Sequence, residues 1–233
     1  VYVAHLGPIC ANGILHAASD SSAGTGLGDG VRGRLVLVTG GGLIGLLTGL
    51  FARQHGAAEV LIADPTLQRR AAAECLGLTA VDETDDLPTT LKQRWRHGPG
   101  DRGADVVFQC RGRAQSLALA LRALRPQGIA VDLAFYTDGA DAVRLGEEFH
   151  HNGLSLRCAQ IGRVPRGQAP FWDRRRLSHE TILLLQEHEV AIRKHLVSDV
   201  VPLETAPQLL TELSQRRRHV LSAVFETEVV GRV

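Results

Sequence analysis

A glycine-rich turn between an apolar run and a helical pattern is the feature that most constrains the fold of this chain. Aliphatic and β-branched side chains fill most of Arg34 to Thr39, which is typical of a strand buried on both faces of a parallel sheet. Apolar side chains then recur at helical spacing from Leu43 to Gln54, and Gly56 follows as a stop. The sequence therefore predicts a strand, a tight turn and a helix.

The turn itself carries the glycine pattern of a dinucleotide-binding fingerprint. Its sequence is Gly40-Gly41-Gly42-Leu43-Ile44-Gly45, in which Gly40, Gly42 and Gly45 match GxGxxG. Gly40 permits the tight turn, Gly42 lets the backbone approach a pyrophosphate, and Gly45 lets the helix pack close to the sheet. Leu43 and Ile44 open the helix whose N-terminus would face the phosphates. Because a predicted strand and helix flank the match, it is more specific than an isolated one.

An acidic residue stands where this fingerprint requires one. Asp64 ends the next predicted strand, 19 positions after Gly45, and its carboxylate can accept hydrogen bonds from the adenosine ribose hydroxyls. The same charge would repel a 2′-phosphate, so the sequence favours NAD(H) over NADP(H). The alternative is a turn that binds nothing, with Asp64 capping the helix at Leu67; the agreement of several separate features favours the cofactor.

Two arginines after Asp64 allow a rival interpretation of the cofactor preference. Arg69 can stack its guanidinium on the adenine, or it can form a solvated helix face together with Arg70. If both arginines reached a 2′-phosphate, the chain would bind NADP(H) instead.

Strands and helices alternate up to about Ala140, which predicts an α/β fold with a doubly wound parallel sheet. A Gly/Ser/Asp-rich stretch from Ser19 to Gly33 predicts turn and loop. The other predicted strands are Val60–Ala63, Thr79–Val81, Ala104–Cys110, Gly128–Leu133, Ser155–Ile161 and Ser222–Glu226. The other predicted helices are Ala11–Ala18, Leu67–Leu76, Leu87–Arg96, Gln115–Leu124, Ser178–Glu187 and Thr205–Gln215.

Composition argues against several classes of protein. Of the 233 residues, 44% are hydrophobic, enough for a core in one large or two modest domains. A formal net charge of +1 gives no electrostatic footprint for nucleic acid or a membrane surface. Because the sequence has neither a membrane-spanning apolar run nor a signal peptide pattern, we expect a cytoplasmic protein. The four cysteines lie far apart, which is typical of reduced thiols.

In order and spacing, these segments resemble the medium-chain dehydrogenase/reductase superfamily, specifically its zinc-type alcohol, sorbitol and threonine dehydrogenase branch. The resemblance implies an NAD-dependent oxidoreductase that passes a hydride between nicotinamide and a small alcohol or carbonyl substrate, as a homodimer or homotetramer. The segments that carry the resemblance are Cys10–Ala17, Val36–Gly45, Asp64 with Arg69, Ala104–Gly112, Leu121–Leu133, Ala159–Arg163 and His195–Ser198.

The resemblance also implies a division into regions. Residues 1–30 would be a connecting helix and linker, residues 31–162 a Rossmann dinucleotide-binding domain, and residues 163–233 the C-terminal part of a GroES-like catalytic domain. Most of that catalytic domain is missing, including its Gly-His-Glu segment, and the sequence opens on Val1, so we expect a partial or processed chain. Zinc would bind only if a missing N-terminal domain supplied ligands.

Cysteines complete the candidate chemistry. Cys10 lies near a zinc-ligand position of some relatives, but one thiolate cannot build a tetrahedral site, so we expect a small buried side chain. Cys110, Arg111 and Gly112 end a predicted strand at the carboxyl edge of the sheet, and the resemblance places them beside the cofactor. We expect Cys110 to line the nicotinamide pocket rather than act as a nucleophile.

Histidines and arginines outside these motifs are weaker candidates. We expect His150-His151 at the surface, His16 partly buried, and the clusters Arg174–Arg176 and Arg216–Arg218 at solvated helix ends. The stretch Arg163–Arg176 predicts either a polar substrate pocket or an interface. Two further functions stay open: a non-catalytic NAD(H)-binding module acting through a partner, and a zinc-independent reductase of the same superfamily.

Overall fold

The structure is a computed structural model that describes residues 2–18, 26–137, 139–215 and 217–227. Contacts divide the chain into two compact units, Val1–Glu187 and His188–Val233, and each is described by itself. Within the described residues, no helix is long and apolar enough to cross a membrane.

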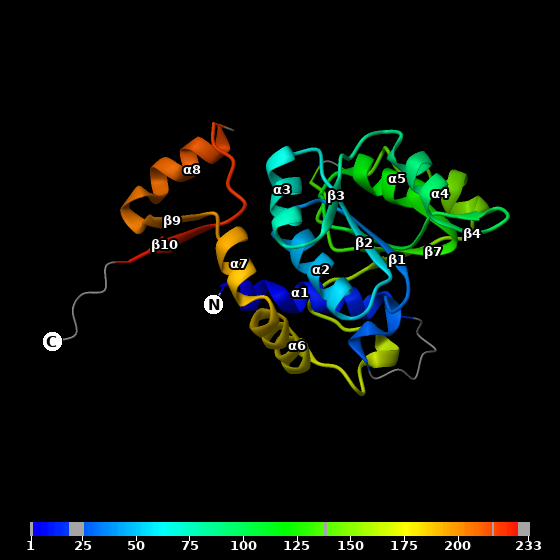
Figure 1. Cartoon of the computed structure of the whole chain (residues 1–233), viewed down its shortest axis with the longest axis horizontal. Helices are drawn as coiled ribbons and strands as arrows, with labels where there is room; N and C mark the ends of the chain where they lie inside the picture. The colour runs from blue at the N-terminus through cyan, green and yellow to red at the C-terminus, as the bar shows by residue number, and fades with distance from the viewer. Residues whose placement is uncertain (1, 19–25, 138, 216, 228–233) are drawn as a thin grey trace. The chain divides into compact units, whose positions relative to one another are not determined.

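Six parallel strands form the sheet of the first unit, in the order β3-β2-β1-β6-β7-β8 (Figure 1). β1 pairs with β2 on one side and with β6 on the other, so the winding reverses beside β1. Open α/β sheets bind ligands at such a reversal, outside the carboxyl ends of the strands. The strands are β1 (Leu35–Thr39), β2 (Glu59–Ala63), β3 (Thr79–Val81), β6 (Ala104–Gln109), β7 (Leu124–Asp132) and β8 (Ser155–Cys158). The predicted doubly wound α/β class is confirmed.

Helices cover both faces of this sheet, because alternate strand residues point to opposite faces. On one face, Leu37 and Leu61 join a buried cluster with Leu117 of α5. On the other face α2 approaches closely, since a Cβ on Gly49 would lie 2.8 Å from Cδ1 of Ile62. The α-helices of this unit are α1 (Tyr2–His16), α2 (Leu43–Gln54), α3 (Leu67–Cys75), α4 (Leu87–Arg94), α5 (Ala114–Ala123) and α6 (Arg174–Glu187).

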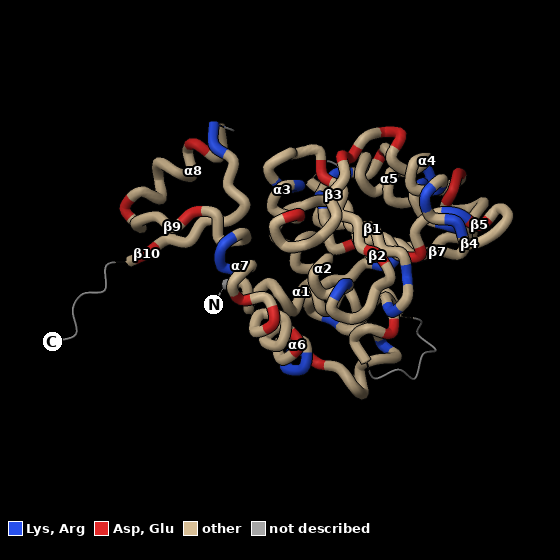
Figure 2. The backbone as a smooth tube through the Cα atoms, viewed as in Figure 1, with Lys and Arg blue, Asp and Glu red and all other residues tan. Residues whose placement is uncertain are grey.

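Short elements complete the first unit. Figure 2 shows charged residues of both signs around the hairpin of β4 and β5, where Arg125 donates to Asp101 and to Asp105, the latter at 2.6 Å. The short elements are η1 (Leu27–Gly30), β4 (Arg96–Gly98), β5 (Asp101–Arg102), η2 (Leu145–Phe149) and η3 (Arg166–Gln168).

The second unit contains two parallel strands with short helices. β9 (Asp199–Pro202) pairs with β10 (Ala223–Glu226), and Arg218 forms an ion pair with Asp199. The helices of this unit are α7 (Glu189–His195), η4 (Leu203–Thr205) and α8 (Ala206–Ser214).

Several predicted element boundaries were wrong. The first helix begins at Tyr2 rather than Ala11, because tertiary packing extends it: a Cβ on Gly7 would lie 2.0 Å from Cγ2 of Thr181 in α6. The strand predicted for Ser155–Ile161 ends at Cys158, because its partner β7 ends at Asp132, opposite Cys158. Of the predicted loop Ser19–Gly33, residues 19–25 lie outside the described residues, and the rest contains the 3₁₀ helix η1.

Candidate dinucleotide-binding site

The glycine turn between β1 and α2 has the geometry that the fingerprint requires. Gly40 adopts a φ of 97°, a left-handed conformation that favours glycine, and its N–H donates to the carbonyl of Ala63 at 2.7 Å. A Cβ on Gly45 would lie 1.8 Å from the Gly40 oxygen, so only glycine fits there. At Gly42, in contrast, no atom lies within 4 Å of an added Cβ. The turn therefore leaves open space at the N-terminus of α2, where Leu43 and Ile44 form the first turn.

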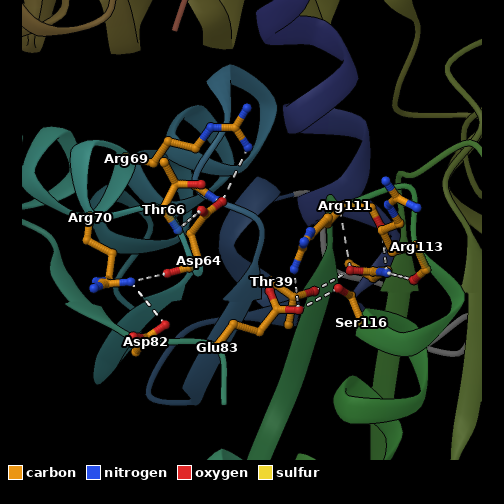
Figure 3. Close-up of polar contacts among 12 residues, drawn as sticks. Thr39, Asp64, Thr66, Arg69, Arg70, Asp82, Glu83, Arg111, Arg113 and Ser116 are labelled. Carbon is orange, nitrogen blue, oxygen red and sulfur yellow. Dashed lines mark hydrogen bonds and ion pairs between the residues drawn. The ribbon is translucent and has the colours of Figure 1, made fainter. Parts of the chain in front are cut away.

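Asp64 joins the end of β2 to this turn. Its carboxylate is buried; Oδ2 accepts a hydrogen bond from the Gly41 N–H at 2.8 Å, and Oδ1 accepts one from the Thr66 N–H at 2.8 Å (Figure 3). The acid and the glycine turn, which lie far apart in the sequence, are thus brought into direct contact. The fixed backbone donors hold the carboxylate in one orientation.

Arg69 and Arg70 have different partners. Arg69 donates to Oδ2 of Asp64 at 3.4 Å and its side chain is 43% exposed, so a half-exposed guanidinium lies over a buried carboxylate. Arg70 pairs with Asp82 at 3.0 Å and donates to the Asp64 carbonyl at 2.8 Å. Displacement of the Arg69 guanidinium would expose Asp64 to ribose hydroxyls. The open space at Gly42, together with an arginine that a ligand could displace from Asp64, fits a bound dinucleotide.

Cys110, Arg111 and Gly112 lie on the other side of β1, at the carboxyl end of β6. A Cβ on Gly40 would lie 3.1 Å from Cβ of Arg111, and one on Gly112 would lie 2.4 Å from the Phe135 oxygen. Burial raises the pKa of the Cys110 thiol well above its ordinary value. The thiol therefore stays protonated near neutral pH. This supports a role in the wall of the proposed cofactor crevice, the region at the carboxyl ends of β1, β2, β3 and β6, rather than as a nucleophile.

Glu83 is a residue that the sequence interpretation missed. It follows β3, and its Oε1 accepts hydrogen bonds from Nη1 of Arg111 at 2.8 Å and from Oγ of Ser116 at 2.5 Å (Figure 3). Its Oε2 is buried and has no hydrogen-bond partner. The available signal was the position of Asp82 and Glu83 directly after a predicted strand, at the same sheet edge as Cys110.

A second polar cluster joins the ends of β6 and β7. The hydroxyl of Tyr136 donates to Oδ1 of Asp132 at 3.1 Å and accepts from Nε2 of Gln109 at 3.2 Å. Burial raises the pKa values of Asp132 and Tyr136. Sequence analysis did not select these residues, because their contacts depend on the loop after β7.

Cys10 lies between α1 and α2. Its sulfur donates to the Ile44 carbonyl at 3.4 Å, and burial raises the pKa of its thiol to about 12. Within the described ranges, no group of three or more His, Cys, Asp or Glu side chains could hold a metal ion. The described residues thus do not fit a zinc site.

The remaining candidates from the sequence are histidines and arginines, and their contacts are with residues other than the glycine turn and Asp64. His150 and His151 are exposed with their rings edge to face at 5.7 Å, and Nε2 of His16 lies 3.4 Å from the Arg163 carbonyl. Arg176 covers the ring of buried Trp172 at 3.8 Å, so part of the Arg163–Arg176 stretch packs internally. In the second unit, Arg218 pairs with Asp199; Arg216 lies outside the described residues.

Comparison with known proteins agrees with this geometry. The sequence profile of the zinc-binding dehydrogenases matches residues 44–169, which is more than half of the chain. D-guloside 3-dehydrogenase from Escherichia coli is 29% identical over 182 residues, covering 76% of this chain and 49% of the relative. Sorbitol dehydrogenase 1 from Saccharomyces cerevisiae is 32% identical over 127 residues, covering 51% of this chain and 36% of the relative.

Solved structures share the fold. A zinc-binding dehydrogenase from Sinorhizobium meliloti, solved with bound NADP, superposes with a TM-score of 0.66 at 22% identity, covering 95% of this chain and 57% of that protein. The chain spans about half the length of these relatives. From the profile match, with the fold in agreement, we conclude that the chain belongs to the zinc-binding dehydrogenase family.

Proposed function

We propose that this chain is the cofactor-binding part of an NAD(H)-dependent alcohol or polyol dehydrogenase. The observation that carries the proposal is Asp64, a buried carboxylate hydrogen-bonded to the glycine turn. It sets a negative charge where an adenosine ribose would lie, which favours two free hydroxyls over a 2′-phosphate. Relatives named for a guloside and for sorbitol support a substrate with several hydroxyl groups.

The residues of the crevice would bind and orient the cofactor. Gly42 leaves room for the pyrophosphate at the N-terminus of α2, where unpaired amides and the helix dipole favour negative charge. Asp64 would hold the ribose, and the protonated thiol of Cys110 would form part of the wall beside the nicotinamide. The bound nicotinamide supplies or accepts the hydride.

The Asp64 charge can be tested with a matched pair of variants. Asp105 is the control, because it also accepts a hydrogen bond from a backbone N–H, that of Leu35 at 2.8 Å, and also pairs with an arginine. Unlike Asp64, it lies near the amino end of its strand, β6. We expect the unmodified chain to bind NADH at least about tenfold more tightly than NADPH. Asp64→Asn should weaken NADH binding by about tenfold and reduce that preference, since a charged acceptor is lost and the repulsion of a 2′-phosphate is relieved.

The measurement is equilibrium titration followed by nicotinamide fluorescence. Asp105→Asn should leave the ratio of the NADH and NADPH dissociation constants unchanged. A chain that prefers NADPH, or an Asp64→Asn variant that keeps the original ratio, would contradict the proposal. We also keep as predictions a homodimer or homotetramer and a cytoplasmic location. The alternatives of a non-catalytic module or a zinc-independent reductase stay predictions as well.

A further inference from the structure

Glu83 has a buried oxygen that lacks a hydrogen-bond donor. Its side chain is only 6% exposed, and Arg111 and Ser116 both donate to the same oxygen, Oε1. The second oxygen, Oε2, is buried without a partner. Because a buried polar atom without a partner is costly, this oxygen indicates a donor that arrives from outside the chain.

Contacts connect Glu83 to the proposed cofactor crevice from two sides. Its ion-pair partner Arg111 lies against Gly40, the first glycine of the turn. Its neighbour Asp82 pairs with Arg70, which also donates to the Asp64 carbonyl (Figure 3). Glu83 follows β3, which lies on the β2 side of β1, and Asp64 follows β2. Glu83 thus links the strand ends on both sides of β1, and its place after β3, beyond Asp64, favours the adenosine half of the proposed crevice.

The chemistry of a dinucleotide leaves one donor for this oxygen. The pyrophosphate offers only acceptors, and the hydroxyls of the adenosine ribose are assigned to Asp64. The nicotinamide ribose and the carboxamide belong to the opposite half of the crevice. The 6-amino group of the adenine remains. We propose that Oε2 of Glu83 accepts a hydrogen bond from this amino group and so selects adenine over a 6-oxo base. The inference rests on the proposed function of dinucleotide binding.

Access to Oε2 depends on Arg111. The Arg111 side chain is 34% exposed and its guanidinium meets Glu83 through one nitrogen, Nη1. The base would reach Glu83 by displacing the exposed part of this side chain, as the ribose would displace Arg69 from Asp64. A 6-oxo base would instead direct a lone pair at the carboxylate, and two acceptors repel.

Substitution of Glu83 by glutamine should convert the acceptor into a donor. Arg111 and Ser116 both donate to Oε1, so the glutamine oxygen must stay at that position. Its amide NH₂ then points where Oε2 was, toward the base. We therefore expect Glu83→Gln to shift the preference from adenine toward a 6-oxo base rather than to weaken binding of both.

The test compares NADH with reduced nicotinamide hypoxanthine dinucleotide, which carries a 6-oxo base, by equilibrium titration. The unmodified chain should bind NADH about tenfold more tightly, and Glu83→Gln should bring the two dissociation constants together or reverse their order. Glu59→Gln is the control, because Glu59 accepts from Arg94 at 2.5 Å and from Nε1 of Trp95 at 2.9 Å at the opposite end of the sheet. This control should keep the original preference.

The outcomes separate this inference from the proposed function. If NADH binds but the unmodified chain does not distinguish the two dinucleotides, the role of Glu83 is wrong while cofactor binding stands. If Glu83→Gln weakens both by the same factor, Glu83 serves only the structure. If neither dinucleotide binds, the proposed function fails and this inference fails with it. Should Glu83→Gln not fold, the preference of the unmodified chain alone decides.

Discussion

Gly42 and Gly45 lie three positions apart, and the structure treats an added side chain differently at each. At Gly45 an added Cβ would lie 1.8 Å from the Gly40 oxygen, so the constraint comes from packing between helix and turn. At Gly42 the backbone φ is −75°, which any residue adopts, and the space around an added Cβ is open. The fold therefore leaves room for a side chain at Gly42, and the proposed pyrophosphate site is what would disfavour one there.

Alanine substitutions at these two positions should give opposite phenotypes. Gly45→Ala should lower the free energy of unfolding by about 3 kcal/mol or more, since the Cβ clashes with backbone that cannot move freely. Gly42→Ala should keep the melting temperature of the unmodified chain but weaken NADH binding, because its methyl group occupies the space of the pyrophosphate. Thermal unfolding and NADH titration of both variants measure this. A Gly42→Ala variant with unchanged NADH affinity would place the phosphates elsewhere.

The glycines and Asp64 were selected from the sequence because their chemistry is local, and Cys110, Arg111 and Gly112 were placed beside the cofactor by resemblance to a family. The three glycines and Asp64 follow from a turn, a helix start and a strand end, each visible in a short window. Glu83 could not be selected in the same way, because its importance comes from contacts with Arg111 and Ser116, about 30 residues later in the chain. Its unpartnered oxygen is visible only in three dimensions.

Among the elements, α1 docks on α2 through a buried thiol. The sulfur of Cys10 donates to the carbonyl of Ile44 in the first turn of α2, and burial raises the pKa of this thiol from 9.0 to about 12. The folded state thus favours the protonated thiol, while the unfolded chain ionises above about pH 9. The contribution of Cys10 to stability is complete below pH 9 and is lost as the pH rises toward 12.

This linkage predicts both reactivity and stability. A thiol reagent at pH 8 should label exposed Cys75 and Cys158 in the folded chain and leave buried Cys10 unmodified until denaturant is added. Half-buried Cys110, whose pKa is raised, should react more slowly than Cys75 and Cys158. Between pH 9 and 11 the melting temperature should fall, and Cys10→Ala should make that fall shallower while Cys75→Ala leaves it unchanged. Rapid labelling of all four thiols in the folded chain would show that α1 does not dock as described.

Elements with strong local periodicity were predicted closely. The helix Leu43–Gln54 has the predicted bounds, because apolar spacing and flanking glycines define it. The short strand Thr79–Val81 also lies where it was predicted. The helix α7 and the strand β9 were missed: α7 has seven residues with one buried side chain, Ile192, and β9 gains its hydrogen bonds only by pairing with β10. Such pairing between distant segments leaves little trace in a local pattern.

At the scale of the molecule, parallel strands gather distant residues at one edge. Gly40, Asp64, Glu83 and Arg111 each follow a different strand of the same sheet, and the fold places all four at the carboxyl ends of those strands. The chain spans about half the length of its relatives, so cofactor binding is proposed for this chain and substrate chemistry for the whole protein.

Direct titration of the unmodified chain with NADH, by calorimetry and by nicotinamide fluorescence, tests the central claim. The account predicts saturable binding at one site per chain, a rise in melting temperature as NADH is added, and competition by NAD⁺. Absence of heat, of fluorescence change and of any shift in melting temperature at millimolar NADH would contradict it.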